Sequence, residues 1–181
     1  VALGYAAFSA ANTNESGNVA IGSSALSALD NGTTAYTYNT AVGYNAGSSV
    51  TSGTQNTIIG GLAGDALTTG GYNVAIGYQA LTSEDGNGKN VAIGWRSLLF
   101  QNAGADAYNV AVGYDAGKSI ATGTENTLIG GLAGDALTTG VQNVAVGYEA
   151  LSTENAHGTV VAVGFQALKT QDAGANTYNV A

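Results

Sequence analysis

The chain has 181 residues, with 4 Lys and Arg against 12 Asp and Glu, so its formal net charge is −8 at pH 7. No basic cluster is present, and this balance excludes the electrostatic footprint of a nucleic-acid-binding protein or of a segment that binds anionic membranes. The chain has no cysteine and no proline, which excludes disulfide and thiol chemistry and leaves all backbone N–H groups able to donate within a β ladder. No apolar run approaches the length of a membrane span, so we expect no membrane insertion by this segment.

A five-residue motif close to Asn-Val-Ala-Ile-Gly recurs along the chain. Complete or nearly complete copies lie at 18–22, 39–43, 56–60, 73–77, 90–94, 109–113, 126–130 and 143–147. A degenerate copy at 160–164 lacks the asparagine, and fragments occupy 1–4 and 179–181. Internal repetition of this kind indicates units that bury their apolar faces on one another, which disfavours a catalytic site built from unlike residues.

The spacing of the motif predicts the fold class. Most successive closing glycines are 17 residues apart, which is too short for a helical repeat of about 30 residues or more. Seventeen residues suit one coil of a β-solenoid, with two short strands and two turns. We therefore predict an all-β, parallel β-solenoid of about ten coils, forming a single repeat array over residues 1–181.

A longer period lies above the first. Segments 39–108 and 109–178 align without gaps, and 42 of their 70 positions are identical, which indicates duplication of a four-coil block. The array begins and ends within a motif, so we expect it to be part of a longer fibre.

Two columns of the motif predict structural roles. The asparagine amides are expected to bond from coil to coil, and the closing glycines to permit a tight bend. The asparagines are Asn18, Asn39, Asn56, Asn73, Asn90, Asn109, Asn126 and Asn143. The glycines are Gly22, Gly43, Gly60, Gly77, Gly94, Gly113, Gly130, Gly147 and Gly164.

The apolar residues of each coil are few. Period-two alternation places the Val/Ile pair on one face of the strand and the alanine on the other. A single coil stack with so little bulk is expected to have a poor core of its own. Close packing of alanine-rich faces between parallel chains would relieve this, although the sequence does not show the number of chains.

An aromatic residue usually follows the closing glycine, as in Tyr44, Tyr78, Trp95, Tyr114 and Tyr148. Stacked coils would place such rings about 4.8 Å apart, close enough for an aromatic ladder. The column is consistent with a purely structural ladder or with a stripe on which sugars stack, and both interpretations remain open.

Metal and catalytic sites are weakly indicated. Asp65 and Asp135 lie in the repeated sequence Gly-Gly-Leu-Ala-Gly-Asp-Ala-Leu, which resembles a calcium-binding nonapeptide but has alanine where that motif has glycine. They are calcium candidates, with turn-capping as the alternative. The only histidine, His157, has no partner of a catalytic or metal-binding kind nearby in the sequence. We predict no cofactor and no enzymatic activity.

The segment Asn-Val-Ala-Ile-Gly-Tyr-Gln-Ala-Leu at 73–81 and its copies resemble two related repeat families. One is the head repeat of trimeric autotransporter adhesins, and the other is the NTAIGYQAL-type repeat of phage tail fibres and related bacterial surface proteins. The resemblance implies a left-handed β-roll or β-prism, three identical chains side by side, Val/Ile pairs directed inward, and an extracellular location on a bacterial surface or a virion. The coil of about 17 residues is longer than the adhesin head repeat, which favours the tail-fibre variant.

Together these features predict a structural shaft that holds a receptor-binding tip away from its anchor. One alternative is a glycan-binding module that uses loop residues or the tyrosine column, and another is an open-ended extracellular filament. Binding to a host-surface glycan or protein is expected in the variable loops at 30–38, 83–89, 100–108, 153–158 and 170–178.

Overall fold

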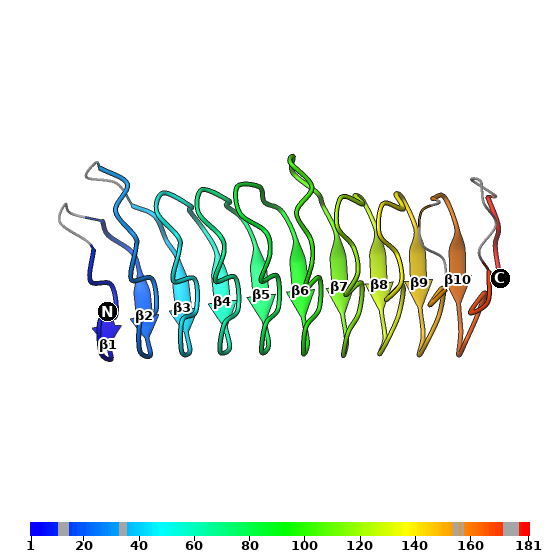
Figure 1. Ribbon diagram of the computed structural model, residues 1–181, viewed down its shortest axis with the longest axis horizontal. Coiled ribbons are helices and arrows are strands. Elements are labelled where there is room, and N and C mark those ends of the chain that lie inside the picture. The colour runs from blue at the N-terminus through cyan, green and yellow to red at the C-terminus, as the bar shows by residue number, and fades with distance from the viewer. Residues whose placement is uncertain (11–14, 33–35, 154–155, 157, 172–177) are drawn as a thin grey trace.

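The computed structural model describes residues 1–10, 15–32, 36–153, 156, 158–171 and 178–181. These residues form a parallel β-solenoid in which each coil contributes one strand to a single ten-stranded sheet (Figure 1). The sheet order follows the chain from β1 to β10. The strands are β1 (Ala2–Leu3), β2 (Val19–Ile21), β3 (Thr40–Val42), β4 (Thr57–Ile59), β5 (Val74–Ile76), β6 (Val91–Ile93), β7 (Val110–Val112), β8 (Thr127–Ile129), β9 (Val144–Val146) and β10 (Val161–Val163).

The predicted fold class is therefore confirmed, with one correction. We expected two strands in each coil, but the described part of the chain has one strand per coil, and turns make up the remainder. Equivalent motif positions pair throughout, as in Val74 with Val91 and Ala75 with Ala92. Ten strands in this register span about 43 Å along the stacking axis, and the two termini lie at opposite ends of it (Figure 1).

The direction of the strand side chains reverses the expectation drawn from the motif. The central residue of β2 to β10 is buried, whereas its two neighbours are half-buried or exposed. The alanines therefore point into their own coil, and the Val/Ile pairs point outward. The prediction that the Val/Ile pairs face inward is wrong, and so is the prediction that alanines pack between chains.

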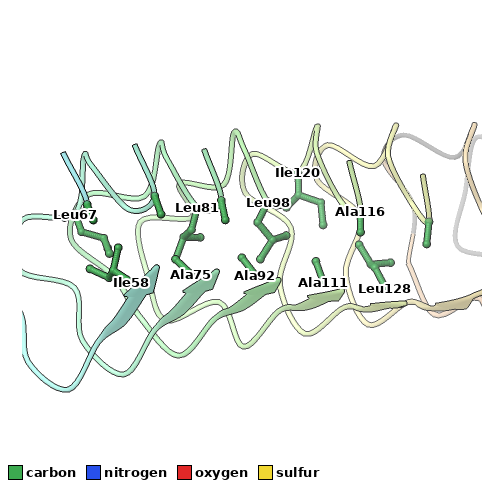
Figure 2. Close-up of a cluster of buried hydrophobic side chains, with 14 of the residues drawn as sticks. Ile58, Leu67, Ala75, Leu81, Ala92, Leu98, Ala111, Ala116, Ile120 and Leu128 are labelled. Atoms are coloured by element: carbon green, nitrogen blue, oxygen red, sulfur yellow. The ribbon is translucent and has the colours of Figure 1, made fainter. Parts of the chain in front are cut away.

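A single chain also has a continuous core, contrary to the poor core that we expected. Leucines from the turns, such as Leu81 and Leu98, reach across to the strand alanines Ala75, Ala92 and Ala111, and all five are fully buried (Figure 2). The interior is narrow, so alanine on one wall leaves room for leucine on the other. This complementarity explains why the smaller residue of the motif is the interior one.

The closing glycines make the close approach between coils possible. Gly43 has a φ of 141°, and a Cβ added to it would lie 2.5 Å from the carbonyl oxygen of Gly60. The other closing glycines through Gly147 face the next coil in the same way. Side-chain-bearing residues also take left-handed conformations in the turns, including Gln79 with φ 54° and Leu81 with φ 53°, which the sequence did not indicate.

Candidate functional site

The most distinctive surface of the molecule is the outward side of the sheet. It consists of four columns, which we call the outward face. Two columns are the outward strand positions, such as Val91 and Ile93. The other two flank them, one directly before the motif asparagine (Tyr72, Tyr108) and one directly after the closing glycine.

Exposed apolar side chains gather on this face. Among the described residues, all of the exposed large hydrophobic side chains except Tyr36, Phe100 and Val141 belong to its four columns. Large contiguous apolar patches are uncommon on monomeric soluble proteins and mark sites of association or ligand binding. The outward face is therefore the strongest candidate for a functional surface.

The aromatic residues proposed for ligand stacking all lie on the outward face. Tyr44, Tyr78, Trp95, Tyr114 and Tyr148 are 40–60% exposed. They do not form one unbroken ladder. The Tyr78 and Trp95 rings contact each other in a tilted arrangement, with a centroid distance of 4.7 Å and an interplanar angle of 32°, and Tyr148 stacks against Phe165 at 5.8 Å. The two ring pairs occupy equivalent coils of the two blocks.

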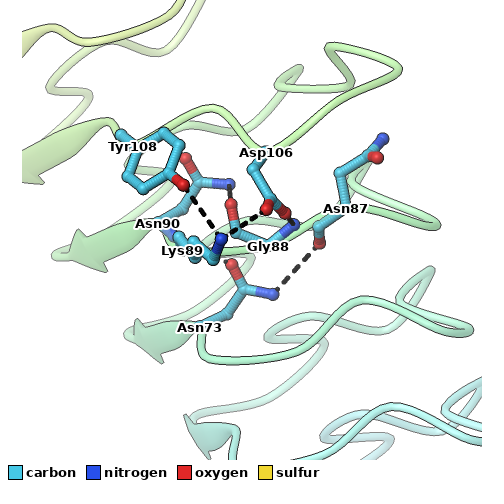
Figure 3. Close-up of polar contacts among 7 residues, drawn as sticks. All are labelled: Asn73, Asn87, Gly88, Lys89, Asn90, Asp106 and Tyr108. Atoms are coloured by element: carbon cyan, nitrogen blue, oxygen red, sulfur yellow. Dashed lines mark hydrogen bonds and ion pairs between the residues drawn. The ribbon is translucent and has the colours of Figure 1, made fainter.

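The column before the asparagine was missed in the sequence. Tyr38, Tyr72 and Tyr108 are each more than half exposed there, and their fixed position next to the asparagine was a signal that could have revealed them. Lys89 takes the same place in one coil. Its Nζ lies 2.6 Å from a carboxylate oxygen of Asp106 and donates a hydrogen bond to the Tyr108 hydroxyl (Figure 3).

The remaining basic side chains are also paired with acids. Arg96 donates two hydrogen bonds to Asp115, Lys118 lies 3.7 Å from the same carboxylate, and Lys169 bonds Glu149. All four cationic side chains of the chain therefore lie beside a carboxylate. Lys169 holds the pKa of Glu149 below its ordinary value, and Lys89 does the same for Asp106. The charge of each of these cations is thus compensated by a neighbouring carboxylate.

The asparagine column forms a buried ladder along the axis. The Oδ1 atom of Asn109 accepts hydrogen bonds from both the backbone N–H and the side-chain amide of Asn126, at 2.9 and 3.1 Å. The Asn126 amide also donates to the carbonyl of Gly140. The amides thus bond from coil to coil, as the motif predicted, and the column is inaccessible to ligands.

The calcium candidates lie on the turn side of the coils. Asp65 and Asp135 each have one buried carboxylate oxygen without a hydrogen-bond partner, and burial raises the pKa of both carboxyls. The described residues contain no group of three or more His, Cys, Asp or Glu side chains arranged to hold a metal ion. Among the described residues, neither aspartate therefore lies in a cluster of carboxylates of the kind that favours calcium binding. His157 lies outside the described residues.

Two of the predicted binding loops contribute to the interior. Glu84, from loop 83–89, and Gln101, from loop 100–108, are both fully buried. Glu84 accepts a hydrogen bond from the Asn87 backbone, and Gln101 accepts one from the Asn109 amide. Both side chains occupy the seventh position after a closing glycine, which is aliphatic in five other coils (Leu29, Val50, Leu67, Ile120 and Leu137), and this equivalence was the signal for their burial. Within the other loops, positions 33–35, 154–155, 157 and 172–177 lie outside the described residues.

Comparison with family models, with curated proteins and with solved structures finds no match. Among the described residues, no helix is long and apolar enough to cross a membrane.

Proposed function

We propose that this chain is a non-catalytic shaft segment of an extracellular fibre, on a bacterial surface or a virion, that keeps a receptor-binding tip at a distance from its anchor. The parallel ladder supports this role because successive coils hydrogen-bond to one another through their backbones, and the motif asparagines add further axial bonds, as between Asn109 and Asn126. A rod of this kind resists bending, since deformation must strain many axial bonds together. The repeated turns provide little variation from which a specific catalytic centre could be built.

The single observation that carries the proposal is the outward face. In the proposed fibre, three parallel copies cover it by packing side by side. The face is about 20 Å wide and 43 Å long, or about 850 Å² of flat area. Stable protein interfaces bury about 800 Å² per partner, so the face is large enough to hold copies of the chain together.

A second candidate function is glycan binding by the aromatic columns. The Tyr78–Trp95 pair favours it, because both rings are exposed and lie against each other on neighbouring coils. In this alternative the outward face remains open to solvent. The two functions therefore make opposite predictions for the environment of the ring column.

Trp95 tests them directly because it is the only tryptophan. In a single chain it is 47% exposed, so a covered face should shift its fluorescence emission to shorter wavelength and lower its acrylamide quenching severalfold. The variant Ile93→Lys with Val112→Lys should restore quenching by disrupting the face. The matched control Ser52→Lys with Asn102→Lys places two lysines at exposed positions off the face and should not. Free quenching of wild-type Trp95 that falls only when oligosaccharide is added would support glycan binding instead.

A further inference from the structure

The coil of β2 has Gly17 and Ser23 in the two flanking columns of the outward face, and two further coils also lack an aromatic residue there. The strands of these two further coils are β4 and β8, and in both the closing glycine is followed by a second glycine, Gly61 or Gly131. Neither coil has an aromatic residue in the column before its asparagine, where Gln55 and Glu125 stand. We call these the notch coils. They recur with the 70-residue block, four coils apart.

The second glycine is not required by the fold of the single chain. Neither Gly61 nor Gly131 has the positive φ of the closing glycines. A Cβ added at Gly61 would lie 3.5 Å from the nearest atom of the Tyr78 ring, and one at Gly131 would lie 3.4 Å from Tyr148, which are ordinary contact distances. Other coils carry Tyr, Trp, Phe or Ser at this position. The missing side chain must therefore be explained by something outside the coil.

The missing ring changes what the face presents. Ile59 and Ile129, on the strands of the notch coils, are 37% and 40% exposed. The equivalent Ile76 and Ile93 are less exposed. The outward face is thus divided into ring-bearing stretches separated by ring-free coils with open isoleucines. On a surface composed of identical repeats, no coil could be distinguished from its neighbours along the axis.

We infer that the notch coils fix the axial register between copies of this chain, so that notch coils lie at the same level in neighbouring copies. Uniform repeats specify register weakly, because a slip by one coil replaces each contact by an equivalent one. With notch coils present, a slip of one or three coils places every notch coil opposite a ring-bearing coil. A slip of two coils does the same, except that the β4 coil of one copy meets the ring-free β2 coil of its neighbour. When the copies are in register, rings of one copy lie at the level of rings of the other, and exposed isoleucines lie at the level of exposed isoleucines. This inference rests on the proposed self-association through the outward face.

The test is to fill the notches and measure register. The filled variant is Gly61→Tyr with Gly131→Tyr, which extends the ring column without interruption from Tyr44 to Phe165. The matched control is Gly61→Ala with Gly131→Ala, which removes both glycines but keeps the coils free of rings. Because the chain has no cysteine, Asp85→Cys in an exposed turn provides a single spin-label site in each background.

Pulsed electron paramagnetic resonance then measures the distances between labels on different copies. Wild type and the alanine control should each give one distance population. The filled variant should give additional populations from copies displaced by one or more coils, each coil being about 4.8 Å. A single population in the filled variant, or several in wild type, would overturn the inference while leaving the fibre intact. A wild-type chain that sediments as a monomer would instead overturn the proposed function, and the register inference with it.

Discussion

Gly60 and Gly61 are chemically identical neighbours with different roles. Gly60 has a φ of 134°, and a Cβ there would lie 2.5 Å from the Gly77 carbonyl oxygen. At Gly61 the nearest atom to an added Cβ is 3.5 Å away. The motif glycine therefore maintains the spacing between coils, whereas its neighbour is free to vary as far as the single chain is concerned.

This contrast predicts different effects of the same substitution. Gly60→Ala should lower the free energy of unfolding by at least about 3 kcal/mol, because it combines a strained φ with a backbone clash. Gly61→Ala should change it by less than about 0.5 kcal/mol. Urea denaturation followed by circular dichroism measures both. Equal effects of the two variants would contradict the assigned role of the closing glycine.

Asn126 is the residue on which the asparagine ladder can best be tested. Its Oδ1 accepts hydrogen bonds from the backbone N–H and the side-chain amide of Asn143, and its own amide bonds Asn109 and Gly140. Asn126→Ala leaves several of these buried groups without partners. We expect a loss of about 3 kcal/mol in unfolding free energy, measured by urea denaturation. The control Asn102→Ala, at an exposed turn position, should have little effect, and a comparable loss there would argue against the ladder.

At the scale of the coil, two positions share the interior. The fourth residue after the closing glycine is leucine where the seventh is polar, as in Leu81 with Glu84 and Leu98 with Gln101. It is glycine where the seventh is aliphatic, as in Gly117 with Ile120. A Cβ added to Gly117 would lie 3.2 Å from the Ile120 side chain, so the two positions compete for the same volume.

Leu26 and Leu29 are the exception, since both are leucine and both are fully buried. A coil can therefore hold two leucines. On this basis Glu84→Leu should stabilise the rod by about 1 kcal/mol at neutral pH, because it removes a buried carboxylate oxygen that lacks a hydrogen-bond partner. Thermal denaturation measures the change, with Asp85→Ala at the exposed neighbouring position as the control. A destabilised Glu84→Leu variant would contradict this account of the coil interior.

Glu84 and two other partly buried carboxyl groups predict that the stability of the fold depends on pH. Burial raises the pKa of Glu84, Asp65 and Asp135, so the folded state binds protons more tightly than the unfolded chain. This contribution to stability is fully present below the unfolded pKa values and is lost as the pH rises through the folded ones. Thermal stability should therefore increase as the pH falls from neutral through the raised pKa values of these carboxyls, and the increase should be smaller in Glu84→Leu.

The lowered pKa values of Asp106 and Glu149 act in the opposite direction, but only as the pH falls below the ordinary carboxyl range. Stability that decreases steadily as the pH falls from neutral through the raised pKa values would show that the buried carboxyls do not dominate.

The sequence predicted the period, the parallel sheet and the axial asparagine bonds, because these depend on the regular recurrence of Asn and Gly. It did not predict which side of the strand faces inward. Alternation in Val91, Ala92 and Ile93 defines two faces but does not choose between them, and the choice depends on leucines such as Leu98 that reach in from the opposite wall. The sequence also places Glu84 in the predicted binding loop 83–89, whereas the structure buries this side chain.

At the scale of the whole molecule, a single chain has a buried hydrophobic core of its own. The apolar side chains that remain exposed lie mainly on the outward face. Because Val and Ile point outward, the apolar residues left over from the core form one long face instead of scattered patches. We propose that copies of the same chain cover this face. In the proposed fibre, the asparagines provide stiffness along the axis, and the outward columns provide the association between copies.

Sedimentation equilibrium of the 17.8 kDa chain tests this claim most directly. We predict one discrete species with three times the chain mass across a wide concentration range, and a shift to the monomer mass in Ile93→Lys with Val112→Lys while circular dichroism retains its β-sheet signal. Open-ended growth would indicate a filament instead of a closed shaft. A stable wild-type monomer would contradict the claim that the outward face is an interface between copies of this chain.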